Sequence, residues 1–141
     1  IPALTKVADE FSGTLAGFDA KMELGSLYFD HVEGTAGAQK ALEWFESAAA
    51  TAPGADQSTI ALYNAGYAQE SLGKCSDAVK TFDRAANAGD GPFLGEVLSG
   101  KARCQATLGD RAGAKATYEQ IEKKLPGTEY AKDAESRKAS L

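Results

Sequence analysis

The sequence predicts an all-α protein, an α-solenoid built from tandem helix–turn–helix units, and three observations support this fold class. The 141 residues include 27 alanines but only 6 Phe, 5 Tyr and 1 Trp, and small side chains allow helices to pack closely. Proline is scarce, at 4 residues, and runs of β-branched residues are nearly absent, so strands are not expected. Short breaks that contain glycine or proline recur at intervals in the thirties, a period typical of helical repeats.

The breaks divide the chain into units of similar length. Their glycines are separated by 41, 37 and 36 residues, and they are Gly13, Gly54, Gly91 and Gly127. A second glycine turn falls inside each unit, at positions 34–37, 73 and 109. Each unit is therefore predicted to be a helix, a short turn and a second helix, followed by a break.

The second helix of each unit carries the same small–large–small pattern at positions i, i+4 and i+7, which lie on one face of a helix. The three copies are Ala41, Phe45 and Ala48; Ala78, Phe82 and Ala85; and Ala114, Tyr118 and Ile121. Three copies at one spacing favour a repeat array over an ordinary alanine-rich bundle. These nine residues are the predicted contacts between helices.

This pattern resembles the tetratricopeptide repeat (TPR). That family has a small pair in its first helix, as in Leu24-Gly25 and Ala65-Gly66, and Gly at the turn. An Ala–aromatic–Ala face follows in the second helix, and Pro stands at the end, as at Pro53 and Pro126. The third unit departs from the pattern at Ile121. The resemblance implies a right-handed solenoid whose concave groove is lined by the first helices.

The expected organisation follows the chain in order. Residues 1–11 form part of a second helix from a preceding repeat, and residues 14–53 form repeat 1, with about four extra residues in its turn from His31 to Gly37. Residues 57–90 form repeat 2, which ends at Asp90 where the family has Pro, and residues 93–126 form repeat 3. Residues 128–141 form a capping helix. The chain is therefore expected to begin inside a repeat, as a fragment or a processed product does.

A narrower resemblance concerns the Pro-Gly-Thr breaks, the Ala-x-x-Ala-x-x-Arg ending (Ala131, Ala134, Arg137) and the period of 36 to 37. These features are similar to bacterial cell-envelope repeat proteins. Examples are the ancillary subunit of the Sec translocon, the Tol–Pal-associated cell-division coordinator and the outer-membrane assembly lipoproteins. The resemblance implies a periplasmic location, with the cytoplasm as the alternative, and a role in envelope assembly or protein export.

The charge and the motifs exclude several function classes. The net charge is -5, so the chain has no basic surplus for nucleic acid or an anionic membrane, and no apolar stretch is long enough to insert into a bilayer. No phosphate-binding loop, catalytic triad or metal-ligand set is present, and no cofactor or catalytic residue is expected. The single histidine, His31, is interpreted as a solvated turn residue rather than a general base or metal ligand. An enzyme is not expected.

Cys75 and Cys104 fall in adjacent units, at the start of one second helix and within the next first helix. Because adjacent repeats stack, the two thiols can lie close together. In an oxidising compartment they would form a disulfide. The alternative is that both are free thiols that fill small spaces in the core.

If the family geometry applies, the groove carries apolar, aromatic and acidic side chains with a single cation. The expected partner-binding residues are Met22, Ser26, Phe29, Asp30, Ile60, Tyr63, Tyr67, Glu70, Glu96, Ser99 and Arg103. Aromatic side chains with polar tips are typical of binding hot spots, and the acidic groups favour a partner segment with Lys or Arg. For Tyr63 and Tyr67, packing between helices is an equally open alternative.

The predicted function is a non-catalytic scaffold or adaptor that binds a protein or peptide segment in this groove. The alternative is a self-assembly module, in which the exposed end of the partial first repeat pairs with another copy of the chain. The two hypotheses differ in the oligomeric state that they predict.

Overall fold

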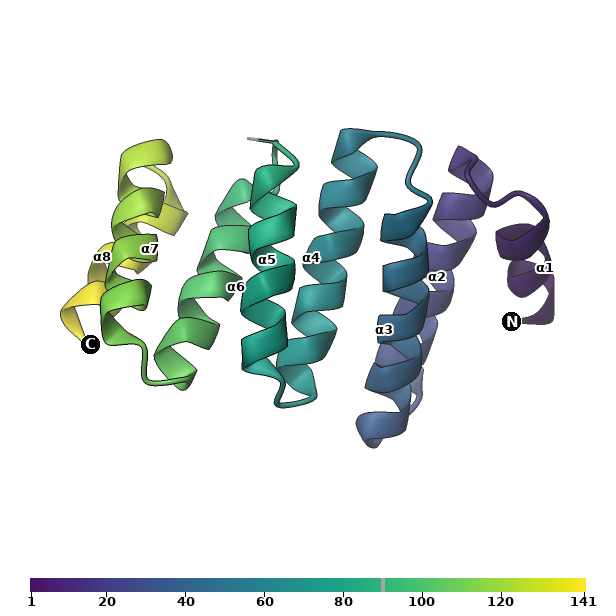
Figure 1. Cartoon of the computed structure of the whole chain (residues 1–141), viewed down its shortest axis with the longest axis horizontal. Coiled ribbons are helices and arrows are strands. Elements are labelled where there is room, and N and C mark those ends of the chain that lie inside the picture. Colours follow the sequence, from purple (N-terminus) through teal and green to yellow (C-terminus); the bar gives the residue numbers. More distant parts are fainter. Residues whose placement is uncertain (90) are drawn as a thin grey trace.

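The computed structural model describes residues 1–89 and 91–141, and in these residues the chain folds into helices joined by short turns (Figure 1). Asp90, the predicted last residue of the second repeat, lies outside the described residues. The helices are α1 (Pro2–Glu10), α2 (Leu15–His31), α3 (Gly34–Ala50), α4 (Ala55–Ser71), α5 (Cys75–Asn87), α6 (Leu94–Thr107), α7 (Arg111–Lys124) and α8 (Glu129–Ala139).

Three helical hairpins make up most of the array: α2 with α3, α4 with α5, and α6 with α7. The breaks that precede α2 and α8 end in a threonine, which caps the following helix. The Thr14 hydroxyl accepts a hydrogen bond from the amide of Gly17 (3.1 Å), and that of Thr128 accepts one from Ala131 (3.3 Å). The repeated Gly-Thr breaks are therefore helix starts.

The turns inside the second and third hairpins depend on glycine. Gly73 and Gly109 have φ values of 74° and 79°, a left-handed conformation that glycine adopts without a Cβ penalty. Each follows the last helical turn directly, so the chain reverses within three residues. The two predicted internal turns therefore lie where the sequence expects them.

The first hairpin differs from the expectation of a long turn between His31 and Gly37. Helix α2 continues to His31 and α3 begins at Gly34, so only Val32 and Glu33 separate them. The extra residues lengthen α3, which has 17 residues where its counterpart α5 has 13, whereas α2 and α4 both have 17. Helix formation satisfies the backbone of these residues, which a long turn would leave to water.

The helices form two layers. In the first layer α2 contacts α4, α4 contacts α6 and α6 contacts α8. Among the described residues, no two of α1, α3, α5 and α7 contact each other, although each packs against the first layer. The array therefore bends so that α2, α4, α6 and α8 lie on its inside, and we call their shared surface the inner face.

The core is divided into clusters that follow the hairpins. All nine residues of the predicted small–large–small pattern are buried, including Phe45, Phe82 and Tyr118. The ring of Phe82 touches the backbone of both Gly66 and Gly100, where an added Cβ would come within 2.7 Å of it. Phe82 therefore packs against its own hairpin and the next one.

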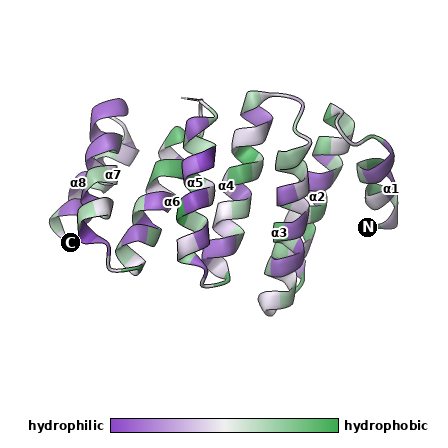
Figure 2. Cartoon of the chain, in the orientation of Figure 1, coloured by the Kyte–Doolittle hydropathy of each residue, from purple (hydrophilic) through white to green (hydrophobic). Residues whose placement is uncertain are grey.

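Each helix is amphipathic or mixed in character. In Figure 2 every labelled helix carries both hydrophilic and hydrophobic residues. Across residues 1–89 and 91–141, none of the helices combines the length and the apolar character needed to cross a membrane. The apolar sides are instead directed into the interfaces between helices.

Candidate functional site

The inner face carries a row of aromatic rings that runs from α2 to α4. The ring centroids of Phe29 and Tyr67 are 5.6 Å apart, and those of Tyr67 and Tyr63 are 6.4 Å apart. The row continues below the surface, because the Tyr63 ring lies 6.2 Å from that of Phe82. These distances are within the range of favourable aromatic contacts.

The two tyrosines in this row have different environments. Tyr67 is 44% exposed, so much of its ring is accessible from the inner face. Tyr63 is half-buried and packs against the core cluster around Phe82, and its burial raises the pKa of its hydroxyl. Tyr63 thus takes part in packing, whereas Tyr67 contacts the neighbouring rings and keeps part of its own ring exposed.

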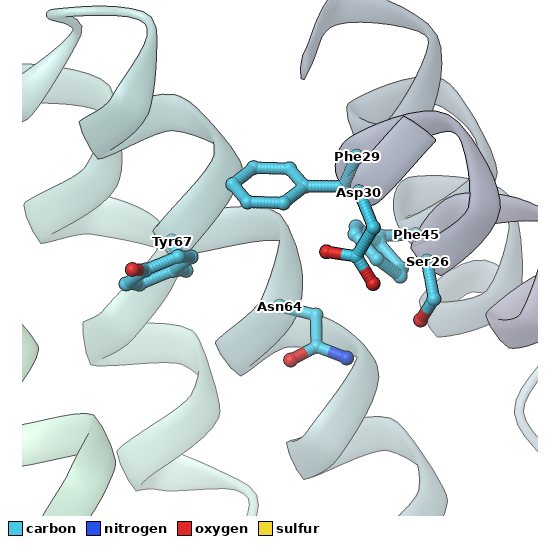
Figure 3. A pocket seen from close by; sticks show the side chains of 6 residues that line it. All are labelled: Ser26, Phe29, Asp30, Phe45, Asn64 and Tyr67. Atoms are coloured by element: carbon cyan, nitrogen blue, oxygen red, sulfur yellow. The ribbon is translucent and has the colours of Figure 1, made fainter. Parts of the chain in front are cut away.

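A hollow of about 310 Å³ opens beside this row, between α2 and α4. Three aromatic residues line it, Phe29, Phe45 and Tyr67, and its polar groups come from Ser26, Asp30 and Asn64. Figure 3 shows Phe29 extending from α2 toward α4 and the Asp30 carboxylate lying between the two helices. The hollow combines aromatic surface with one carboxylate and one amide.

Two further hollows adjoin the first one along α2. One shares Ser26 with it and is lined by Met22, Ile60 and the carboxylates of Asp19 and Glu23. The other shares Phe29 and Asp30 and also contains Glu33 and Ser71. None of the three hollows is lined by a lysine or arginine. Met22 and Ile60 are half-buried here and contribute apolar surface.

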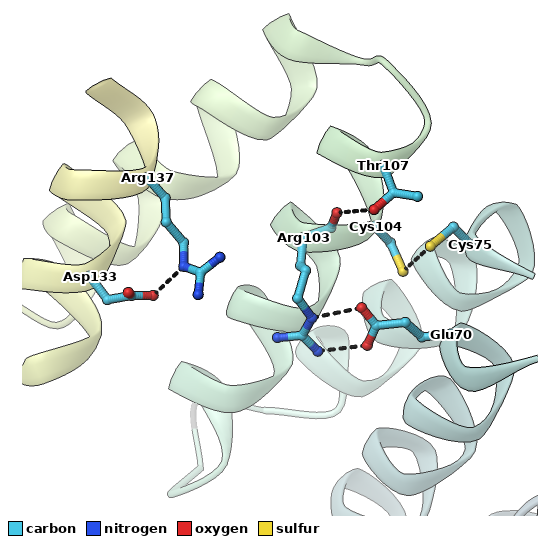
Figure 4. Close-up of polar contacts among 7 residues, drawn as sticks. All are labelled: Glu70, Cys75, Arg103, Cys104, Thr107, Asp133 and Arg137. Carbon is cyan, nitrogen blue, oxygen red and sulfur yellow. Dashed lines mark hydrogen bonds and ion pairs between the residues drawn. The ribbon is translucent and has the colours of Figure 1, made fainter. Parts of the chain in front are cut away.

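The inner face changes character between α4 and α6. The guanidinium of Arg103 donates to both carboxylate oxygens of Glu70, at 2.6 and 2.7 Å (Figure 4). This hydrogen bonding raises the pKa of Arg103. Arg103 and Glu70 were both predicted groove residues, and the structure pairs them with each other.

Farther along, Glu96 and α8 form a second internal contact. The hydroxyl of Tyr130 donates a hydrogen bond to Oε1 of Glu96, which raises the pKa of Tyr130 to about 12. On α8, Arg137 donates to Asp133 at 2.8 Å. Ser99 is half-buried on α6 nearby. The carboxylates in this half of the inner face therefore have donors within the chain.

The single histidine and the two cysteines are not among the residues that line the three hollows. His31 is exposed at the end of α2. Over the part of the chain that the structure describes, no three His, Cys, Asp or Glu side chains gather in a way that could hold a metal ion. Cys75 and Cys104 are buried and face each other, with the two Sγ atoms 2.6 Å apart and both thiols free (Figure 4).

Sequence reasoning missed two residues of the hollow. Phe45 was assigned only to the core, yet it also lines the hollow. Asn64 was not assigned to the groove, although it stands three residues before Tyr67 on the same side of α4. The spacing of Asn64 and Tyr67 was the signal that could have indicated this.

The family model described as tetratricopeptide repeat matches residues 60–88 and 96–128, which contain most of α4 with α5 and of α6 with α7. These two segments therefore match tetratricopeptide repeats in sequence. The matched residues are fewer than half of the chain, and no curated protein and no solved structure matches it significantly.

The first hairpin is built like the matched TPR at 60–88. A Cβ added to Gly25 would lie 2.3 Å from the Phe45 ring, just as one added to Gly66 would lie 2.7 Å from the Phe82 ring. In both hairpins the glycine thus lets the paired aromatic ring touch the backbone. TPRs generally mediate protein–protein interaction, and the all-helical array is an α-solenoid of such hairpins.

Proposed function

We propose that this TPR protein is a scaffold that binds a segment of another protein along its inner face. The observation that supports this most is the exposed ring of Tyr67 beside the hollow between α2 and α4. Concave sites with an aromatic lining and a few polar groups are typical of binding sites. The other aromatic residues give the site a rigid wall, because Phe29 and Tyr63 are held by their neighbours.

Repeat scaffolds bind through surface complementarity rather than through a reaction. The hollows are open, and their linings combine apolar side chains with a few polar groups, which suits an extended or helical peptide. The proposal also includes the finer expectation of a role in bacterial envelope assembly or protein export, which is supported by the sequence resemblance described above. Fractionation of cells that produce the native protein tests the location separately.

The binding proposal is tested with a photocrosslinking residue placed at a single position in the full chain. At position 67 it should crosslink to a partner in cells. At position 46 it should not, because Glu46 is an exposed residue of α3, which lies in the outer layer. The purified partner should then bind the parent chain and lose binding to Tyr67→Ala, with unchanged helical circular dichroism. Equal crosslinking from both positions would contradict the proposal.

Self-assembly is a second candidate, and it is supported by a different surface. Ile1, Phe11 and Leu15 are 55%, 50% and 55% exposed, and they lie at the beginning of the array. Exposed apolar groups at the end of a repeat stack favour contact with another copy. Light scattering should then show a concentration-dependent dimer that salt barely changes and that Phe11→Ser with Leu15→Ser abolishes. A monomer at high concentration would eliminate this candidate.

A further inference from the structure

The four carboxylates beside the hollows of α2 differ from the other acidic groups of the inner face. In the described chain, no ion pair or hydrogen bond from a lysine or arginine reaches Asp19, Glu23, Asp30 or Glu33. Glu70, Glu96 and Asp133, by contrast, accept hydrogen bonds from Arg103, Tyr130 and Arg137. The negative potential of the inner face is therefore concentrated on its α2 side.

Aromatic surface lies within the same region. Phe29 and Tyr67 form two walls of the hollow, and the carboxylate of Asp30 and the amide of Asn64 line it as well (Figure 3). An aromatic face attracts a cation, and a carboxylate at the same place adds a charge-assisted hydrogen bond. An acidic or purely apolar side chain would not satisfy the Asp30 carboxylate when water is displaced.

The size of the hollow is compatible with one long side chain. About 310 Å³ is larger than a single small group needs, and the hollow is open toward the inner face. The stem of a lysine or arginine would lie against the aromatic lining, and its charged end would reach the polar groups. The occupant is thus defined by three features: an aliphatic stem, a positive charge and hydrogen-bond donors.

We propose that the hollow between α2 and α4 is an anchor site for a lysine or arginine side chain of the partner protein. The site lies on the α2 side of Tyr67, and the α6 side acts as a neutral continuation of the groove because Arg103 is already bound to Glu70. This inference rests on the proposed function, and it adds which side chain of the partner binds and where.

The test begins with a random dodecapeptide library displayed on phage and selected on the full chain. Sequences that also bind Tyr67→Ala are discarded. The remaining peptides should share a lysine or arginine next to an apolar residue. Selection of Tyr67-dependent peptides without a basic residue would overturn the anchor site and leave the groove function standing. If no Tyr67-dependent peptide is selected, the groove function itself fails.

A double-mutant cycle on one synthetic peptide with arginine at the shared position completes the test. Asp30→Asn should weaken its binding about tenfold, and replacing the peptide's arginine by neutral citrulline should do the same. The two changes together should cost little more than either alone. Glu46→Gln removes one negative charge from the outer layer and is the matched control, which should leave affinity within about twofold. Additive effects in the cycle would overturn a direct contact.

A second inference concerns Cys75 and Cys104, and it does not depend on the groove. Cys75 begins α5 and Cys104 lies in α6, so the thiols belong to consecutive hairpins. Cys75 is 6% exposed and Cys104 is fully buried, and the Sγ atoms of the two residues contact each other. Burial raises the pKa of the Cys104 thiol, so as a free thiol it reacts slowly with external reagents.

We infer that this pair is a disulfide site that closes while the chain folds in the presence of a thiol–disulfide oxidant. One thiolate attacks the disulfide of an oxidant such as oxidised glutathione and releases one thiol. The second cysteine then displaces the other thiol from the mixed disulfide. Two electrons pass to the oxidant, the two cysteine protons end on its released thiols, and one Sγ–Sγ bond forms.

The test is refolding of the full chain from denaturant in oxidised and reduced glutathione. The expected product has the mass of the reduced chain less two hydrogen atoms, does not react with N-ethylmaleimide after denaturation and melts several degrees higher than the reduced chain. Cys75→Ser, refolded in parallel, should keep one reactive thiol and the lower melting temperature. Two free thiols or stable glutathione adducts in the parent chain would overturn the site.

Discussion

Arg103 on α6 donates two hydrogen bonds to Glu70 on α4, so one guanidinium joins consecutive hairpins on the inner face. The two residues are 33 positions apart in the sequence. The side chain of Glu70 is 19% exposed and that of Arg103 is 38% exposed. A two-point contact with this much burial stabilises more than an ordinary surface ion pair does.

The first prediction concerns this pair. Arg103→Lys keeps the charge but removes the planar two-point geometry, and the free energy of unfolding should fall by about 1 kcal/mol. The control is Arg137→Lys, because Arg137 pairs with Asp133 in an exposed i,i+4 contact, and its cost should be about 0.5 kcal/mol or less. Urea denaturation of the three proteins makes the comparison. Equal losses of unfolding free energy in the two variants would show that the Arg103–Glu70 pair stabilises the protein no more than an exposed ion pair does.

The second prediction concerns Gly66. A Cβ there would lie 2.7 Å from the Phe82 ring, which cannot retreat because Gly100 contacts it from the next hairpin. Gly66→Ala should lower the free energy of unfolding by about 1–3 kcal/mol, although alanine is the better helix former.

A cycle with Phe82 separates this clash from other effects. In the background of Phe82→Leu, which removes the ring, Gly66→Ala should cost clearly less than in the parent chain. Thermal and urea unfolding of the four proteins give the coupling energy. The explanation fails if the cost of Gly66→Ala is the same in both backgrounds.

The third prediction concerns Lys21, which is 4% exposed on α2 and donates hydrogen bonds to the hydroxyls of Ser12 and Thr51 at 2.9 and 2.8 Å. Its burial lowers the pKa of the ammonium group below 10.5. The unfolded chain therefore holds this proton more tightly than the folded chain. It follows that the contribution of Lys21 to stability is least favourable at neutral pH and rises as the pH passes through the lowered pKa toward 10.5.

Lys21→Met keeps most of the aliphatic volume and removes the titrating group. The parent should therefore gain unfolding free energy relative to this variant as the pH rises from 7 to about 10. Urea denaturation of both proteins at several pH values measures it. A difference that stays constant over this range would show that Lys21 remains charged in the folded protein.

The fourth prediction concerns Tyr130 and Glu96, which join α8 to α6. The hydrogen bond raises the pKa of Tyr130 from 10.0 to about 12, so its contribution is complete below pH 10 and is lost as the pH rises toward 12. Tyr130→Phe should lower the free energy of unfolding by about 1 kcal/mol at pH 7. The gap from the parent should narrow above pH 10. A gap that widens there would contradict this assignment.

The helical hairpins could be predicted because their determinants are local and repeated. The Ala78, Phe82 and Ala85 face recurs at one spacing in three helices, and each copy is buried in the structure. The length of the first turn was predicted wrongly, because Gly34 and Gly37 indicate a turn in the sequence. In the structure Gly37 is instead a helical residue of α3 that lies against the backbone of Val32 and Tyr28, where a Cβ would clash.

The candidate site was harder to predict because it depends on contacts between hairpins. The sequence placed Glu70 and Arg103 in the groove but could not show that they neutralise each other across 33 residues. The sequence also could not show which of Tyr63 and Tyr67 is buried, since the two are one helical turn apart. The neighbouring Phe82 ring covers Tyr63. Lys21 is buried without any sequence signal, because its partners lie in two different turns.

The arrangement of the layers has a mechanical consequence. Each of the outer helices α3, α5 and α7 packs against two helices of the inner layer, namely its hairpin partner and the inner helix that follows it in the chain. A change in the curvature of the array would therefore have to slide or open these packed interfaces. The outer helices thus hold the curvature of the inner face, and a partner segment meets a surface of defined shape.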